Sequence, residues 1–167
     1  MPQIKTVAFV SLFTLLSVLT PFLFHFAAGP QLGRMFLPLQ IFVFVSGLLL
    51  GWPAGILTGF CAALLSYLVS GMPYLNVLPW VMVELIFYGF LAGLLRKELK
   101  INLWLSLILT MVLGRFLLWL AIFVLPTGLA PSPYFKAAIL NGWPGILLQL
   151  AFIPFLVKIS QRFLSYE

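Results

Sequence analysis

The sequence contains no aspartate, one cysteine and one histidine, and these scarcities exclude several kinds of site. No Ser/His/Asp set can be assembled, and neither an H-E-x-x-H metal motif nor a G-x-x-x-x-G-K-[ST] nucleotide loop is present. Cys61 lies within an apolar run, so we expect a packing residue rather than a disulfide or metal ligand. His25 has no second His, Cys or Asp to complete a metal site. We therefore expect no enzyme, no cofactor and no bound metal.

Charged residues are also few: they make up 7% of the chain, whereas 63% of its residues are hydrophobic. A soluble domain has roughly 25% charged residues, so most of this surface must face something other than water. Nine Lys and Arg against three Glu give a net charge of +6. These cations lie mostly at the ends of apolar segments, which is typical of membrane orientation rather than nucleic-acid binding.

The apolar segments separate at Gly/Pro clusters, and each is close to the ~20 residues that cross a bilayer. We predict an all-α integral membrane protein in which residues 1–167 form one compact bundle of six transmembrane helices. The predicted spans are 6–26, 35–50, 54–70, 79–96, 103–125 and 137–164. The first span also has the basic start and apolar core of a signal peptide, but its apolar run is long, so we expect it to remain uncleaved.

Basic residues predict the orientation. With a cytoplasmic N-terminus, six cations lie inside (Lys5, Arg96, Lys97, Lys100, Lys158 and Arg162), against Arg34 and Lys136 outside. This balance favours N-in and C-in, in a cell membrane. The longer connectors 27–34, 71–78 and 126–136 then share the outer face, where loops on a rigid scaffold commonly cap a site.

Glycines at four-residue spacing occur in three consecutive spans. Small residues at this spacing allow helices to approach closely in lipid. The pairs are Gly47/Gly51, Gly55/Gly59 and Gly89/Gly93, and Ala63 extends the second. They predict tight packing among the second, third and fourth spans.

Most of the polar residues within the spans fall in the predicted outer half, beneath the long connectors. Glu84 is the only carboxylate inside a span and Arg115 the only cation near mid-depth, and each needs a partner in a medium of low dielectric. One hypothesis is an ion pair joining the fourth and fifth spans. The other is that one or both face a water-filled cavity and contact a polar solute. The two hypotheses are compatible, because a paired carboxylate can orient an arginine.

The same half of the bundle supplies the other candidate binding residues: His25, Arg34, Gln40, Tyr74 and Asn141, with Gln149 deeper. Aromatic residues lie near the span ends, namely Tyr67, Tyr74, Trp80, Tyr134 and Trp143. An interfacial aromatic belt explains most of them. Alternatively, Tyr74, Trp80 and Tyr134 cover a ring-shaped ligand.

Three stretches carry a family resemblance: "FLPLQIFVFVSGLLLGWPAGILTG" (36–59), "LLSYLVSGMP" (64–73) and "MVELIFYGFLAGLLRK" (82–97). Together they resemble the substrate-binding S-components of energy-coupling factor transporters, with His25 and Gly114-Arg115 as flanking agreements. Position 40 is Gln where the family often has His. The A-x-x-x-A contact for the coupling subunit is also missing, because Ala8 is followed by Leu12; Ser11, Thr14 and Ser17 are a substitute small face.

The resemblance implies a six-helix protein that binds a vitamin or related micronutrient at the outer face of the membrane. It also implies partners, namely a transmembrane coupling subunit and two ATP-binding subunits. Arg34, Arg115 and Lys136 would suit an anionic group, so pantothenate is one candidate substrate, and a cobalamin-related or flavin compound is another. Two alternatives stay open. One is a self-sufficient secondary carrier or channel that uses Glu84 for proton coupling, and the other is a membrane assembly protein without a ligand.

Overall fold

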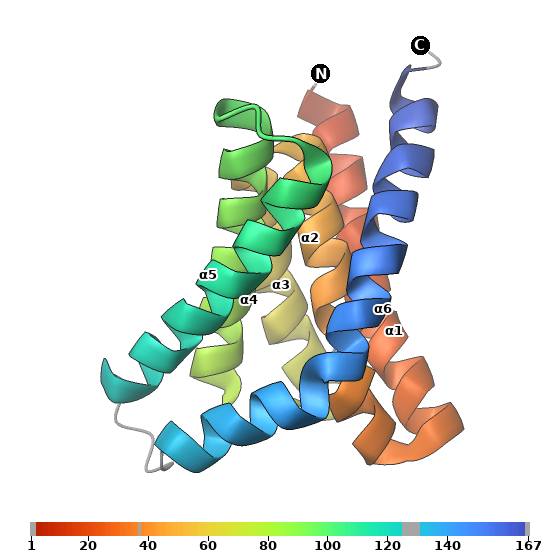
Figure 1. Ribbon diagram of the computed structural model, residues 1–167. Coiled ribbons are helices and arrows are strands. Elements are labelled where there is room, and N and C mark those ends of the chain that lie inside the picture. Colours follow the sequence, from red (N-terminus) through yellow and green to blue (C-terminus); the bar gives the residue numbers. More distant parts are fainter. Residues whose placement is uncertain (1–2, 37, 125–130, 166–167) are drawn as a thin grey trace.

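The computed structural model describes the backbone of residues 3–36, 38–124 and 131–165, and the side chains of residues 4–23, 39–120, 124 and 142–162. Every regular element in this part of the chain is helical. In chain order they are α1 (Gln3–Phe36), α2 (Pro38–Leu50), α3 (Trp52–Ser70), α4 (Leu78–Gly93), the π-helical turn η1 (Leu94–Glu98), α5 (Leu103–Val124) and α6 (Pro131–Ser165). The six α-helices form one bundle (Figure 1), as the hydropathy pattern predicts.

Five segments of the described chain are long and apolar enough to cross a membrane: Ile4–Leu23, Trp52–Ser70, Leu78–Glu98, Leu103–Leu120 and Gly142–Arg162. The chain is therefore a multi-pass membrane protein. The predicted second span is shorter than expected, because α2 has 13 residues and so measures about 20 Å at 1.5 Å per residue.

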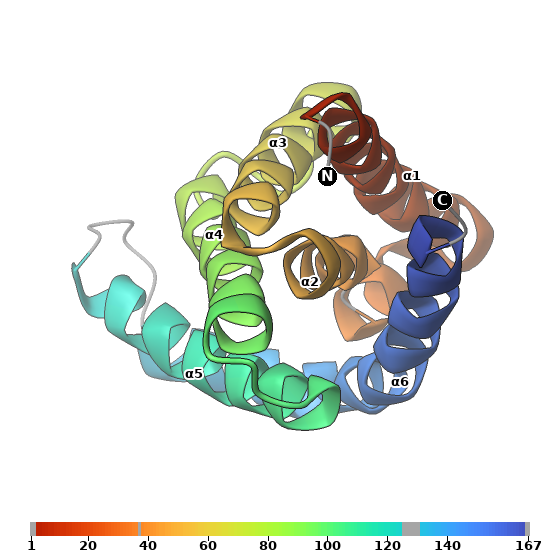
Figure 2. The ribbon, with the colours of Figure 1, turned by 90° about the horizontal axis from the view of Figure 1, so that it is seen from above.

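The short helix α2 lies at the centre of the bundle, with the other helices around it (Figure 2). Residues 43–49 of α2 are all buried, and its hydrophobic side chains belong to the central core cluster. Because protein rather than lipid surrounds α2, its length does not have to match the hydrocarbon thickness of ~30 Å. The apolar character of α2 therefore reflects its position in the protein core.

Two predicted connectors are largely helical. Residues 27–34 belong to α1, which extends to Phe36, and α6 starts at Pro131 rather than at residue 137. Proline is favoured in the first turn of a helix, where its missing N–H costs nothing, so Pro131 at the start of α6 does not exclude helix there. The helical path of α1 changes direction near its C-terminal end, and α6 bends between a transverse first part and an upright second part (Figure 1). Pro144 lies inside α6 and accounts for a bend there.

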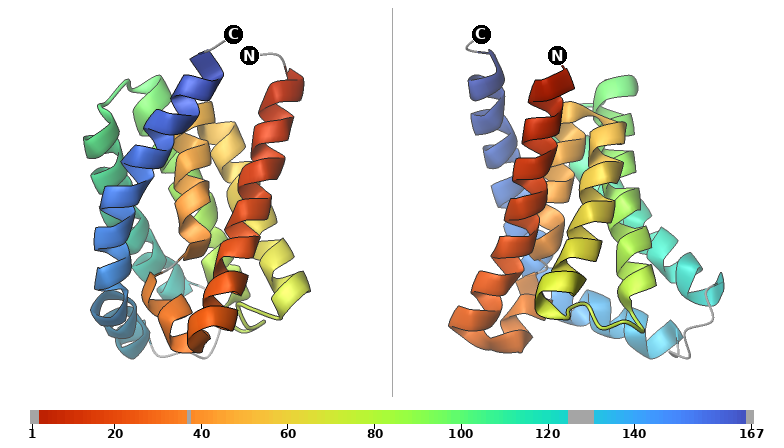
Figure 3. Two further views of the ribbon diagram at one scale, coloured as in Figure 1. Left: turned by 90° about the vertical axis from the view of Figure 1, so that its right-hand side faces the viewer. Right: turned by 180° about the vertical axis from the view of Figure 1, so that it is seen from behind.

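The two ends of the bundle differ, as the predicted topology requires. Both termini lie at one end, together with the α2–α3 and α4–α5 junctions (Figures 1 and 3). The C-terminal end of α1, the loop 71–77 and the N-terminal end of α6 lie at the other. The six cations expected inside all belong to the end with the termini, and five of them are exposed there: Lys5, Lys97, Lys100, Lys158 and Arg162. Which end faces the cytoplasm stays a prediction.

Glycine brings α3 and α4 into backbone contact. A Cβ atom added to Gly55 or to Gly89 would collide with the backbone of the other residue, and one on Gly59 would lie 2.6 Å from the Leu85 carbonyl oxygen. Gly47 of α2 and Gly93 of α4 are equally closely approached by backbone. The prediction of close packing is confirmed at these five positions.

Gly51 has another role. A Cβ atom there would meet only ordinary contacts, but the residue has a φ of +100° at the start of α3. Glycine adopts such a φ without the steric cost that a side chain imposes. Gly51 therefore allows the one-residue turn between α2 and α3, and its backbone also lies close to α4, because a Cβ atom on Gly93 would collide with the carbonyl carbon of Gly51.

Candidate functional site

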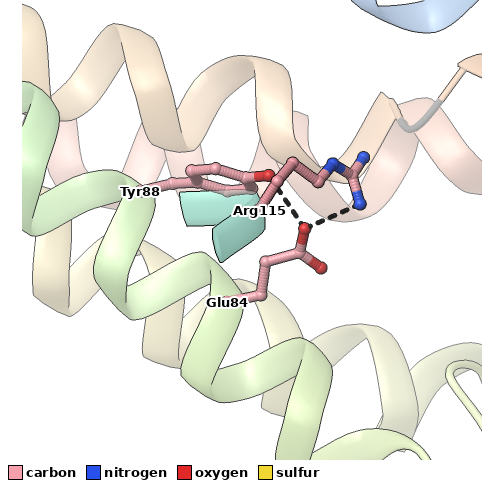
Figure 4. Close-up of polar contacts among 3 residues, drawn as sticks. All are labelled: Glu84, Tyr88 and Arg115. Atoms are coloured by element: carbon pink, nitrogen blue, oxygen red, sulfur yellow. Dashed lines mark hydrogen bonds and ion pairs between the residues drawn. The ribbon is translucent and has the colours of Figure 1, made fainter. Parts of the chain in front are cut away.

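The only carboxylate within a predicted span, Glu84, lies on α4 and is 6% exposed. Its Oε1 atom is 3.1 Å from Nη1 of Arg115, which comes from α5 and is 13% exposed (Figure 4). The predicted ion pair is thus confirmed. Pairing compensates two charges whose isolated burial would cost several kcal/mol each. Glu84 and Arg115 therefore form a buried unit of zero net charge between neighbouring helices.

Tyr88 completes this cluster. Its hydroxyl donates a hydrogen bond of 2.9 Å to Oε1 of Glu84, one helical turn earlier on α4. Its ring lies 4.7 Å from the ring of Phe44 on α2, measured between centroids. A Cβ atom on Gly114 would collide with the Tyr88 ring, so the missing side chain at the residue before Arg115 makes room for this tyrosine.

Tyr88 is not among the residues predicted from the sequence. The predicted aromatic residues lie near the span ends, whereas Tyr88 lies inside a span and is 1% exposed. Its spacing of four residues from Glu84 was the available signal, because such side chains face each other on a helix.

The geometry of the cluster leaves Glu84 with capacity to accept another hydrogen bond. Tyr88 and Arg115 both reach Oε1, and Figure 4 shows Oε2 pointing away from these two partners. A carboxylate accepts about four hydrogen bonds through its two oxygens. A hydroxyl or N–H group of a bound solute can therefore be accepted at Oε2 while the ion pair stays intact.

Gln40 lies at the level of this cluster. The helices α2 and α4 run in the same direction (Figure 1), and contact between Phe44 and Tyr88 fixes their relative height. Gln40 lies one turn before Phe44 on α2, and Glu84 lies one turn before Tyr88 on α4. The Gln40 side chain is 6% exposed, so it faces the bundle interior from the first turn of α2.

The other predicted site residues have different positions. Tyr74 lies in the loop 71–77 and is 55% exposed, apart from the buried cluster. The side chains of His25, Arg34 and Asn141 lie outside the described residues, as do those of Tyr134 and Lys136. Gln149 is 1% exposed and interacts within the protein.

Trp80 is fully buried, one turn before Glu84, so the interfacial-belt alternative is wrong for this residue, and its ligand-covering alternative stays a prediction. The Trp80 side chain faces the core of the bundle, so it is packed against protein rather than placed at the membrane surface. By contrast, Trp143 is 58% exposed, as a belt residue requires.

The predicted small face on α1 is also wrong. Ser11 is exposed, whereas Thr14 and Ser17 are buried, so the three hydroxyls do not share a surface. Residues 11, 14 and 17 are successive i, i+3 neighbours along α1, and the boundary between its exposed and buried sides falls between Ser11 and Thr14. Within the described residues no group of three His, Cys, Asp or Glu side chains gathers as a metal site.

A bundle of apolar helices around a buried polar cluster is the architecture of a multi-pass membrane protein, and ionisable residues inside a membrane commonly mark a functional site. The model of the family "ECF-type riboflavin transporter, S component" matches residues 1–158. The chain belongs to this family, and the predicted family resemblance is confirmed. It is accordingly the substrate-binding subunit type of an energy-coupling factor transporter, and not an enzyme. No curated protein and no solved structure matches it.

Proposed function

We propose that the chain captures a neutral, vitamin-like solute from the outer face of the cell membrane, and that riboflavin is the first candidate. The observation that carries this proposal is the buried Glu84–Arg115–Tyr88 cluster, whose polar groups lie within an otherwise apolar core. Burial of such groups is costly unless it serves the fold or a function. The cluster retains a hydrogen-bond acceptor beside aromatic and aliphatic surface, which suits a polar ring compound.

The charge of the cluster favours a neutral solute over an anion. Arg115 already pairs with Glu84 at 3.1 Å, so it is not an uncompensated positive charge waiting for a carboxylate. This weakens the case for pantothenate, which rested on three cations, of which the side chains of Arg34 and Lys136 are undescribed. Riboflavin is neutral and hydrogen-bonding, and it is the substrate named in the description of the matching family.

Energy for uptake would come from partner subunits. The sequence lacks a phosphate-binding nucleotide loop, so we propose a transmembrane coupling subunit and two ATP-binding subunits as partners. In the proposed orientation both termini are cytoplasmic. The exposed cations Lys97 and Lys100 then lie on the cytoplasmic side, where such partners would dock.

A secondary carrier driven by protons through Glu84 is the second candidate. Proton coupling requires a carboxylate that exchanges protons with water during transport. Glu84 instead accepts a hydrogen bond from Tyr88 and pairs with Arg115, and it is 6% exposed between α4 and α5. The ion pair therefore favours a binding role over a relay.

Uptake assays separate these candidates. In a riboflavin-requiring host without coupling subunits, the chain alone is expected to give no accumulation of labelled riboflavin. Co-expression with a coupling subunit and its ATP-binding subunits is expected to give ATP-dependent uptake. Variants of the ATP-binding subunits that cannot hydrolyse ATP are the matched control. Uptake by the chain alone would contradict the proposal and favour the carrier.

A further inference from the structure

The connector between α4 and α5 presents two exposed lysines at the end of the bundle where both termini lie. Lys97 belongs to η1 and Lys100 follows it, and the side chains of both are exposed. Neither lysine forms an ion pair among the described residues. Glu98 lies between them in the sequence and is also exposed. With Arg96, the connector 96–100 has three cations and one carboxylate, so its net charge is +2.

Hydrogen bonds fix the shape of this connector. Nη1 of Arg96 donates to the carbonyl oxygen of Ile101 at 3.0 Å. The backbone N–H groups of Leu99 and Ile101 donate to carbonyl oxygens of η1 at 3.0 and 2.9 Å. Lys100, between these two residues, has a φ of +53°, which is uncommon for a residue with a side chain. The backbone that carries the lysines is therefore already ordered, and an ordered loop loses little conformational entropy when it binds a partner.

The turn between α2 and α3 lies beside the end of α4 (Figure 2) and adds an aromatic residue to this region. A Cβ atom on Gly51 would lie 3.9 Å from Cγ of Lys97, so the lysine stem is within van der Waals reach of the turn. Trp52 begins α3 and is 39% exposed. Its ring lies 6.1 Å from the ring of Phe90, measured between centroids. Trp52 thus packs on α4 two turns before Lys97, at a greater depth in the bundle.

The limits of the spans place this connector at the membrane surface. The apolar segment Leu78–Glu98 ends just before it and Leu103–Leu120 begins just after it. Leu99 is 60% exposed here, and Trp104, in the first turn of α5, is 50% exposed. Tryptophan is enriched at the headgroup level, and a lysine can contact apolar groups with its stem while its ammonium stays in water. A phospholipid matches this combination, because it supplies a charged phosphate and hydrocarbon together, whereas a soluble anion supplies only the charge.

We propose that this region binds an anionic phospholipid such as phosphatidylglycerol. We call it the basic corner, and it consists of Trp52, Lys97, Leu99, Lys100 and Trp104. The two ammonium groups bind the headgroup through charge-assisted hydrogen bonds to phosphate, and the apolar side chains contact the acyl chains. The proposal does not depend on vitamin capture, because Glu84 lies 13 residues before Lys97, which is roughly 20 Å along a helix.

The test is native mass spectrometry of the purified full chain with added phosphatidylglycerol or phosphatidylcholine. The two lipids are chosen with the same acyl chains, so that they differ in the headgroup and its net charge. The wild type is expected to bind phosphatidylglycerol roughly 25-fold more tightly than phosphatidylcholine, about fivefold for each lysine. The double variant Lys97→Gln/Lys100→Gln is expected to lose this preference and to bind phosphatidylcholine as the wild type does.

Three further variants serve as controls, all at exposed positions where substitution changes stability little. Lys97→Arg/Lys100→Arg keeps both charges and should retain the preference for phosphatidylglycerol. Lys158→Gln removes an exposed cation from α6 at the same end of the bundle, and should change the preference less than about twofold. Trp104→Ala removes an apolar contact but no charge, so it should weaken binding of both lipids alike.

Three results would overturn the proposal. The first is a wild type that binds the two lipids equally, or a double variant that keeps the preference. The second is an equal loss in Lys158→Gln, which would show a general attraction of anionic lipid to the positive end of the bundle. The third is a double variant that keeps its lipid preference but loses ATP-dependent uptake with coupling subunits, which would assign Lys97 and Lys100 to a protein interface. Failure of the chain to bind a vitamin would change none of these outcomes.

Discussion

Replacing Arg115 by glutamine is expected to destabilise the purified protein by about 3 kcal/mol. Removal of one partner of a buried ion pair leaves the other charge uncompensated, and this typically costs about 3–5 kcal/mol. Here Glu84 keeps only the hydrogen bond from Tyr88 among the contacts at Oε1. The measurement is the free energy of unfolding in mild detergent, followed by helical circular dichroism.

A double-mutant cycle tests the cause of this loss. Glu84→Gln with Arg115→Gln removes both charges, so the double variant should be more stable than the sum of the two single effects implies, by about 1–3 kcal/mol. Lys97→Gln is the matched control, because Lys97 is an exposed cation in η1, the turn that follows α4. Strict additivity would mean that Glu84 and Arg115 do not interact.

Replacing Gly89 by valine is expected to be the most disruptive change in the apolar core, with a loss of at least about 2 kcal/mol in unfolding free energy. A Cβ atom at Gly89 would collide with the backbone of Gly55, and backbone cannot move aside as a side chain can. The higher helix propensity of a non-glycine residue offsets less than about 1 kcal/mol of this loss.

The control for Gly89→Val is Ala151→Val, which adds methyl groups at an exposed position of α6. Unfolding of both variants is measured under the same conditions. A Gly89→Val protein as stable as the wild type would show that α3 and α4 do not pack as closely as the structure indicates.

Much of the fold can be predicted from the sequence because hydropathy and helix-breaking Gly/Pro clusters are local properties of the chain. Apolar runs and Gly/Pro breaks predict the helices, and their even number places both termini at one end. The helix limits were less predictable: Pro131 was taken as a break, but it occupies a helical first turn. The shortness of α2 depends on its central position, which is a tertiary property.

The part of the candidate site that contains charged side chains was predictable, because each charge had few possible partners of opposite sign. A single intramembrane carboxylate and a single cation near mid-depth predict a pair, and Glu84 and Arg115 form one. Tyr88 depends on helix register and on the space left by Gly114.

We predict that the chain alone binds its solute, through the buried Glu84–Arg115–Tyr88 cluster and without ATP. The direct measurement is equilibrium titration of riboflavin into the purified, nucleotide-free protein, with mass spectrometry of the solute retained on gentle purification. We predict saturable binding that weakens roughly 5- to 150-fold when Glu84 or Arg115 is replaced by glutamine, and that is unchanged by Lys97→Gln or Lys100→Gln. Binding lost with these two lysines, yet unaffected by changes at Arg34, Gln40, Tyr74, Glu84, Arg115 and Asn141, would contradict the account.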